Sequence, residues 1–319
     1  MLNIAYSIST ELRESLNRIE TLRHQILTTP ISPKTETRMR WEATVARTYW
    51  ALAASPQPLP KAEIIKLFAL PNPKKISAKE LEAIHYKQAM DFIRQEWLVN
   101  PRSVSFRVIS TLSDILYART ELRGLLRVVA GQESAIKHVL DYLQAQAENP
   151  IVSGSALRAY LAANDALSLD NGRLANLAMY LLFYKAGYDC RGLIVMEEFW
   201  QEDAGATRQI QSECFKNGNY TVWLEYVAKG ITAQLEKTIL DIESNRSHTD
   251  IPSVFWELND RQKQVLSLLE APDSSITNRK VQKMFRISQI TASRDLSKLA
   301  TMGLLFSHGK GRSVYYTKA

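Results

Sequence analysis

The stretch "DALSLDNGRLANLAMYLLFYKAGYD" (165–189) joins a polar turn to a strongly apolar run. The turn ends in "NGR" (171–173), and glycine in such a turn lets backbone N–H groups approach an anion. The apolar run predicts a buried helix over 171–186, closed by Gly187. The stretch therefore has the order of a phosphate-binding loop leading into a core helix, but it contains no histidine.

Helical periodicity extends over most of the chain, which has only 12 glycines and 11 prolines in 319 residues. Ser77 followed by Glu80 is typical of a capping box at the start of a helix. The predicted helices cover about 8–27, 37–54, 78–97, 103–126, 133–146, 153–163 and 171–186. The fold class predicted for this part is mainly α.

A further long helix is predicted from six apolar residues at three- and four-residue steps. They are Trp223, Val227, Ile231, Leu235, Ile239 and Ile242. Such a stripe packs on the core or on a second subunit, and the second alternative makes it a candidate dimer element.

The composition is that of an ordinary folded protein, with 45% hydrophobic and 23% charged residues. Cys190 and Cys214 have no ligand-like spacing, which favours buried thiols in a reducing cytoplasm. The chain shows neither the order of a signal peptide nor an apolar run long enough to span a bilayer. We therefore expect a cytoplasmic protein that uses no membrane, no metal and no cofactor.

The net charge of +7 is concentrated at one end. From residue 251 onward there are 11 basic and 5 acidic residues, a surplus of six. A small basic module on a near-neutral body points to a polyanionic partner. The polar stretch 243–253 separates the two charge regimes, so we expect an N-terminal segment (1–35), a helical domain (36–247) and a basic domain (248–319).

The basic end reads as three helices and a β-hairpin. Asn259 or Asp260 caps the first helix, "NRKVQKMF" (278–285) forms the second and residues 288–302 form the third, before Gly303. Two β-prone arms then flank "HGKGR" (308–312). The stretch "ITASRDLSKLATMGLL…GKGRSVYY" resembles the winged helix-turn-helix family, with its small β-hairpin wing.

That resemblance implies that the third helix enters the major groove of double-stranded DNA. Arg294 can contact guanine with two hydrogen bonds, and Gln289 can contact adenine. The candidate DNA-binding residues are Ser288, Gln289, Thr291, Ser293, Arg294, Ser297 and Lys298 on the helix, and His308, Lys310 and Arg312 on the wing. A homodimer on two half-sites is expected. The alternative is a module that contacts another protein.

The middle of the chain resembles the Fic family, enzymes that transfer AMP from ATP to a hydroxyl group of a target protein. The segment "LLFYKAGYDCRGLIVMEEF" (181–199) carries the match, and the family signature is HPFx(D/E)GNGRxxR. This chain keeps Asn171, Gly172 and Arg173. It has Asp165 in place of the histidine, Leu169 in place of the metal-binding acid, Asp170 in place of the first glycine and Asn176 in place of the second arginine.

These departures predict a Fic-like domain without transferase chemistry and without catalytic residues. The histidine removes a proton, and a carboxylate with a pKa of about 3.9 is a poor substitute. Leucine cannot bind Mg²⁺, and a carboxylate at Asp170 repels phosphate. A register shifted by one residue makes Asp170 the acid but puts Ala166 in the histidine's place.

The same segments have structural interpretations. Asn171 is expected to cap the following helix, Gly172 to form a tight turn and Arg173 to pair with a local acid or carbonyl. Glu197 and Glu198 are expected to be surface or capping acids. The sequence thus predicts a DNA-binding transcriptional regulator whose Fic-like domain is a scaffold, a dimerisation surface or a sensor. The open alternatives are a nucleotide or small-molecule ligand in that domain, a residual AMP-transferase and a protein-interaction adaptor.

Overall fold

The computed structural model describes residues 4–55, 58–69, 76–146, 149–163, 170, 172–244, 258–269, 274–309 and 314–318. The chain divides into two compact units. The first unit consists of Met1–Pro30, Ala46–Leu59 and Ser77–Arg246, and the second of Ile31–Val45, Pro60–Ile76 and Ser247–Ala319. The second unit thus includes two segments from the N-terminal part of the chain, while the boundaries expected near 35 and 247 stay predictions.

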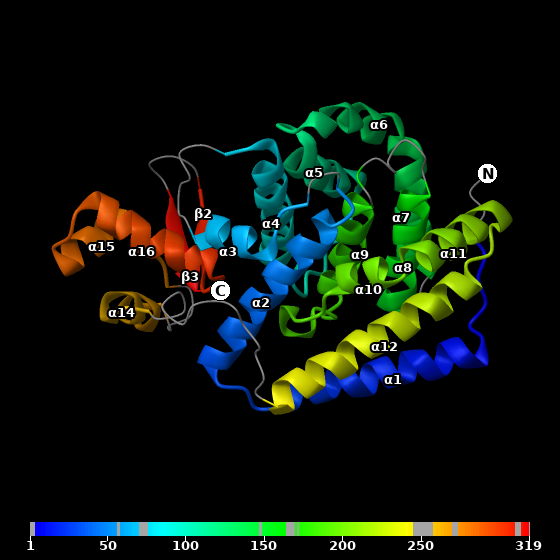
Figure 1. The fold of residues 1–319 in the computed structure, drawn as a ribbon, viewed down its shortest axis with the longest axis horizontal. Coiled ribbons are helices and arrows are strands. Elements are labelled where there is room, and N and C mark those ends of the chain that lie inside the picture. The colour runs from blue at the N-terminus through cyan, green and yellow to red at the C-terminus, as the bar shows by residue number, and fades with distance from the viewer. Residues whose placement is uncertain are drawn as a thin grey trace. The chain divides into compact units, whose positions relative to one another are not determined.

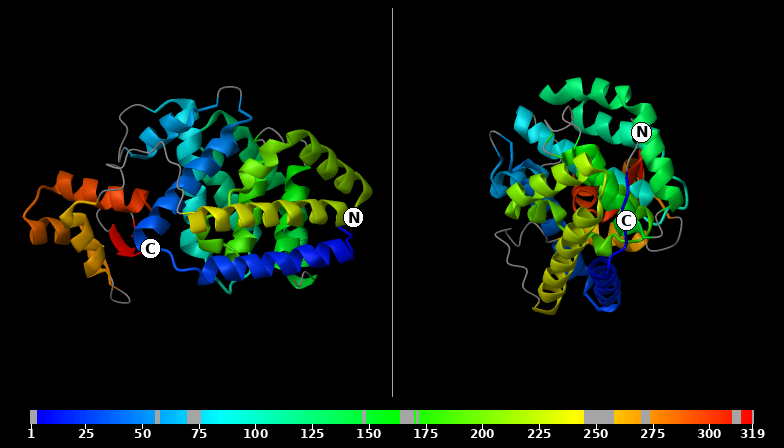
Figure 2. Two further views of the ribbon diagram at one scale, coloured as in Figure 1. Left: turned by 60° about the horizontal axis from the view of Figure 1, so that its bottom comes forward. Right: turned by 90° about the vertical axis from the view of Figure 1, so that its right-hand side faces the viewer.

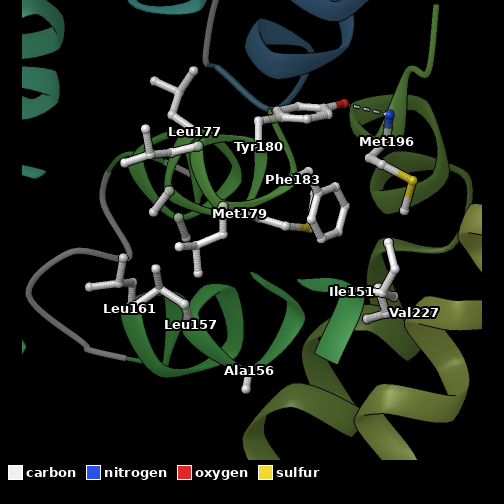
Figure 3. Packing of buried hydrophobic residues seen from close by; sticks show 14 of the residues in the cluster. Ile151, Ala156, Leu157, Leu161, Leu177, Met179, Tyr180, Phe183, Met196 and Val227 are labelled. Atoms are coloured by element: carbon white, nitrogen blue, oxygen red, sulfur yellow. Dashed lines mark hydrogen bonds between the residues drawn. The ribbon is translucent and has the colours of Figure 1, made fainter. Parts of the chain in front are cut away.

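Two buried helices, α8 (Pro150–Ala162) and α9 (Arg173–Lys185), form the centre of the first unit (Figure 1). Almost every residue of both helices is buried, as expected for a helix surrounded by other elements. The two helices pack closely because Gly154 faces Phe183: a Cβ atom at Gly154 would lie 2.6 Å from the Phe183 ring. Figure 3 shows this packing between α8 and α9.

The remaining helices of the first unit surround this pair. Helices α4 and α5 pack on α9, and α7, α11 and α12 pack on α8. Their bounds are α1 Thr10–Thr28, α4 Ala78–Trp97, α5 Phe106–Tyr117, η1 Glu121–Gly124, α6 Leu125–Gly131, α7 Glu133–Gln146, η3 Cys190–Gly192, α10 Met196–Glu202, α11 Ala204–Asn217 and α12 Thr221–Ser244.

The apolar stripe of α12 is buried within a single chain, so it is not a free dimer element. Helices α1 and α12 run parallel, side by side (Figures 1 and 2). Polar contacts join them along their length, such as the ion pair between Arg18 and Glu236 at 2.8 Å. Trp223, Val227 and Leu235 belong to the core of the unit. Of the two alternatives for this stripe, packing on the core is the one observed.

The helix expected over 103–126 is wrong in its length. Helix α5 ends at Tyr117, and a 3₁₀ turn, η1, follows. The hydroxyl group of Thr120 accepts a hydrogen bond from the N–H group of Leu122 at 3.2 Å, which starts the new turn. Threonine hydroxyls compete with helical hydrogen bonds in this way. Apolar periodicity alone did not reveal the break.

The second unit ends in a small three-stranded antiparallel sheet. Its C-terminal elements are α14 (Asp260–Leu268), β1 (Ile276–Thr277), α15 (Asn278–Phe285), α16 (Gln289–Thr301), β2 (Leu305–His308) and β3 (Tyr315–Lys318). The strand order is β1-β3-β2, with Leu305 opposite Lys318. Ala292, Leu296 and Leu299 of α16 are buried in its core, as their i, i+4, i+7 spacing predicts.

Two other helices complete the described elements. Helix α2 (Pro33–Leu52) has residues in both units, and α3 (Lys61–Ala69) contacts α16 within the second unit. The predicted fold class, mainly α with a small β-hairpin near the C-terminus, is confirmed. Among the described helices, none has the length and apolar character that crossing a bilayer requires.

Candidate functional site

The start of α9 is occupied by a carboxylate of the chain itself. Asp170 is 1% exposed, and its two oxygens accept hydrogen bonds from the N–H groups of Gly172 at 2.7 Å and Leu174 at 2.8 Å. The buried hydroxyl group of Tyr117 also donates to this carboxylate. A phosphate bound at a helix start uses the same kind of N–H group. At α9 those donors already have an anionic partner.

The glycine and the arginine of the "NGR" turn have structural roles. Gly172 has a φ of +77°, a conformation that favours glycine. Arg173 is buried and donates to Glu82 at 2.6 Å and to the carbonyl oxygen of Asp170 at 2.9 Å. Asp170 caps the start of α9 through backbone N–H groups, and the cap expected from Asn171 falls on a residue outside the described ranges. Three residues of the predicted motif lie outside the described residues: Asp165, Leu169 and Asn171.

Asn176, at the place of the family's second arginine, contacts an arginine from another helix. Arg158 of α8 is 4% exposed and donates to Asn176 at 2.7 Å and to Gln211 at 3.0 Å. Its guanidinium group lies 3.7 Å from the centre of the Trp200 ring, and Trp223 is also close. Burial lowers the pKa of Arg158 to about 9, so the group is still charged at neutral pH. Sequence reasoning missed Arg158, although it is the one charged residue of α8.

A second buried polar cluster surrounds Glu197. This carboxylate is buried and accepts hydrogen bonds from Tyr86 at 2.5 Å and Tyr180 at 2.9 Å. Burial raises the pKa of Glu197, and the nearby Arg47 opposes that shift. The expectation of a surface or capping acid is therefore wrong for Glu197. It anchors α10 to α4 and α9.

Within the described residues, no group of three histidine, cysteine, aspartate or glutamate side chains could hold a metal ion. Cys190 and Cys214 are both buried free thiols, and burial raises the pKa of each to about 12. Thiols with such a pKa are protonated at neutral pH and are therefore weak nucleophiles and poor metal ligands.

The predicted DNA-contacting residues of α16 lie at its N-terminal end and along its solvent side. Ser288 caps the helix by accepting a hydrogen bond from the N–H group of Thr291 at 3.2 Å. Ser288, Gln289 and Arg294 are exposed. The half-buried members of the set are Thr291, Ser293, Ser297 and Lys298. A helix that presents polar groups at its N-terminal end has the arrangement used to contact base edges.

The acidic residue of α16, Asp295, is turned away from this surface. It accepts hydrogen bonds from Arg261 at 2.5 Å, Gln262 at 2.8 Å and Asn259 at 3.4 Å, all at the start of α14. Burial raises the pKa of Asp295, but these hydrogen bonds outweigh it and hold the pKa below its usual range. The negative charge therefore faces α14 and is neutralised there.

Helix α15 carries a group of exposed cations that the predicted set omitted. Arg279, Lys280, Lys283 and Arg286 are all exposed, and none of them forms an ion pair with another described residue. In helix-turn-helix proteins the helix before the recognition helix crosses the DNA backbone. The signal was present in the sequence, as four basic residues within "NRKVQKMFR" (278–286).

Of the three residues predicted for a wing, the structure describes one. His308 on β2 lies 2.9 Å from the hydroxyl group of Thr317 and stacks on Tyr315, with ring centres 4.9 Å apart. Lys310 and Arg312 lie outside the described residues. The structure therefore shows the antiparallel strands β2 and β3 on either side of the predicted wing, while the roles of its two cations stay predictions.

Comparison with known proteins agrees with the fold and does not extend to the site. No family model matches the chain. No curated protein matches it either. Among solved structures, the chain is similar to a Fic family protein from Desulfovibrio desulfuricans G20, with a TM-score of 0.56 and 11% identity over 98% of this chain and 97% of that one. At this identity the likeness is one of fold, and by fold the chain is Fic-like.

Proposed function

We propose that the chain is a sequence-specific double-stranded-DNA-binding regulator of transcription, with α16 as the recognition helix of a winged helix-turn-helix. The observation that carries the proposal is the distribution of charge around α16. Its one aspartate, Asp295, is buried against α14, while Gln289 and Arg294 are exposed. The outward side therefore offers hydrogen-bond donors and positive charge to a polyanion.

The cations of α15 support the same proposal. Four exposed basic side chains without a described ion-pair partner suit contacts to phosphates, which position a protein on DNA without reading its sequence. One module of this size covers a short half-site. We therefore expect two copies on half-sites about one helical turn apart.

We further propose that the Fic-like fold of the first unit acts as a scaffold, a dimerisation surface or a sensor and does not transfer AMP. Support comes from Asp170, whose buried carboxylate takes the backbone donors that a phosphate would need. A nucleotide at this turn would have to displace a carboxylate from three hydrogen bonds. The displaced carboxylate and the Tyr117 hydroxyl group would then lose their partners inside the core, at a cost of about 1–3 kcal/mol for each group left unpaired.

The proposal is tested by binding the full-length protein to random-sequence duplex DNA and sequencing the retained fraction. We expect enrichment of one sequence family that contains an inverted repeat, with affinity that falls steeply as salt rises. Recovery of DNA without any common sequence, or affinity that is insensitive to salt, would contradict the proposal.

A matched pair of charge reversals locates the binding surface. Lys283→Glu on α15 and Lys216→Glu on α11 change the net charge equally, and both side chains are exposed. We expect Lys283→Glu to weaken binding on the order of tenfold, because it replaces a phosphate contact by a repulsion. Lys216→Glu should have less than about a twofold effect. Equal losses would mean that only the total charge matters.

A further inference from the structure

Ile290, in the first turn of α16, is an apolar residue on an otherwise polar surface. Its side chain is 66% exposed, and Val99 is the one large apolar residue in the described ranges that is more exposed. Isoleucine also has a lower helix propensity than most polar residues with unbranched side chains. Neither burial nor helix formation therefore accounts for isoleucine at this position.

The helical geometry places Ile290 in the middle of the outward side. At 3.6 residues per turn, it lies opposite the buried row that contains Ala292, Leu296 and Leu299. The exposed Arg294 follows it by one turn on the same side, and Ser297 follows by two turns. Any DNA that approaches Arg294 along this side of α16 therefore meets Ile290 as well.

The major groove offers an apolar group that fits such a side chain. Thymine presents its C5-methyl group there, and 5-methylcytosine carries a methyl group on the same ring atom. We propose that Ile290 recognises the C5-methyl group of a pyrimidine in the major groove, an inference that rests on the DNA-binding function proposed above. Each methyl group removed from water is worth about fourfold in affinity.

The spacing along α16 limits where this pyrimidine lies. Ile290 and Arg294 are four residues apart, about 6 Å along the helix axis. Successive base pairs are about 3.4 Å apart. The methyl-bearing pyrimidine is therefore within about two base pairs of the guanine that Arg294 contacts. A site in which every thymine is more distant from a guanine does not fit the proposal.

The experiment uses the full-length protein and the duplex most enriched from random-sequence DNA. Each thymine of that duplex is replaced singly by deoxyuridine, which removes the methyl group and keeps the hydrogen-bonding groups. We expect one position in each half-site at which deoxyuridine weakens binding about fourfold. Ile290→Ala should weaken binding to the thymine duplex by a similar factor or more and should bind the two duplexes equally at that position.

Two further base replacements identify the source of the methyl group. Cytosine and 5-methylcytosine are compared at the sensitive position and at each CpG step. A methyl effect confined to thymine assigns Ile290 to T·A pairs, whereas an equal gain from 5-methylcytosine assigns it to the methyl group of either base. In both cases the affinity that the methyl group adds should be lost in Ile290→Ala.

Control variants separate this inference from general damage. Leu268→Ala removes another exposed apolar side chain of the second unit, on α14. It should leave unchanged the ratio of the affinities for the thymine duplex and the deoxyuridine duplex. Arg294→Ala should weaken binding and keep that ratio. The inference fails if no thymine is sensitive to deoxyuridine, or if the sensitivity persists in Ile290→Ala. Failure to enrich any common sequence overturns the DNA-binding function first and this inference with it.

Discussion

The positive N-terminal ends of α9 and α16 are capped by residues of different charge. At α9 a buried carboxylate, Asp170, accepts from two backbone N–H groups and is itself bound by Tyr117. At α16 the neutral hydroxyl group of Ser288 caps the helix. The first end is neutralised inside the core, whereas the second keeps its positive potential and faces solvent.

The placement of aspartate determines this difference. Asp170 lies at the helix end that an anion would approach, and Asp295 is buried on the side of α16 that faces α14. We therefore expect the start of α9 to exclude an anion and the start of α16 to bind one. For this reason we expect the chain, despite its Fic-like fold, to bind a polyanion with its second unit rather than its first.

The largest effect is expected from Asp170→Ala. This change leaves the N–H groups of Gly172 and Leu174 and the hydroxyl group of Tyr117 without their acceptor inside the core. We expect the free energy of unfolding to fall by about 3–4 kcal/mol. Denaturant unfolding followed by circular dichroism measures it.

Asp203→Ala is the matched control, because Asp203 also accepts from a helix-start N–H group, at Ala206, but is exposed. We expect Asp203→Ala to lower the free energy of unfolding by about 1 kcal/mol. The wild type should show no rise in unfolding temperature with Mg²⁺ and ATP at about 1 mM. A rise that Asp170→Ala abolishes would show that nucleotide binds at the start of α9 and that this helix end is open to an anion.

A smaller effect is expected from Asp295→Ala, which removes the acceptor of Arg261 and the buried Gln262. We expect the second unit to lose about 2–3 kcal/mol of stability. Asp260→Asn is the control, because its side chain is 95% exposed, and it should change stability by less than about 0.5 kcal/mol. The free energy of unfolding and the affinity for DNA are both measured, because Asp295 holds α16 in place and α16 is the proposed DNA-contacting helix.

The pH dependence of Asp295 follows from the direction of its pKa shift. The folded pKa lies below the ordinary value, so the unfolded chain takes up the proton first as the pH falls. The stabilisation is complete above the unfolded pKa and is lost as the pH drops from about 4 through the folded pKa. Asp295→Asn should remove this part of the acid dependence. An unchanged acid profile in that variant would contradict the assigned role.

Patterns within one helix could be predicted from the sequence. The capping box of Ser77 and Glu80 is present, and Asn259 caps α14 in a second one. Helix α7 has the predicted bounds, and the apolar row of α16 is buried. These features depend on residues a few positions apart, where backbone hydrogen bonding and side-chain periodicity determine the outcome.

Contacts between distant helices could not be predicted. Tyr117 meets Asp170 and Arg261 meets Asp295 only because several helices pack in a particular arrangement. The local pattern also predicted the wrong environment for Glu197, because two adjacent acids, Glu197 and Glu198, are typical of a surface. Its burial depends on two tyrosines from other helices. The sequence predicted the polar residues on the outward side of α16. It did not predict the exposed Ile290, because apolar residues are expected to be buried.

A sequence-dependent effect is expected from Arg294→Ala. Arg294 is exposed on the outward side of α16, where it can form two hydrogen bonds with guanine. Its loss should cost about 1–3 kcal/mol on the enriched sequence and relax the preference at one base pair. Binding to the enriched duplex and to random duplex is compared by fluorescence anisotropy. Equal losses on both would refute base reading by this residue.

The smallest effect is expected from Lys280→Ala, which separates the role proposed for α15 from that proposed for α16. Lys280 is exposed on α15, and Lys137 on α7 is the matched control with the same change in charge. A lysine that contacts one phosphate should weaken all sequences by a similar factor and lower the slope of log affinity against log salt by about one. Lys137→Ala should leave the slope unchanged. A change in sequence preference on Lys280→Ala would mean that α15 also reads bases, because a phosphate contact carries no sequence information.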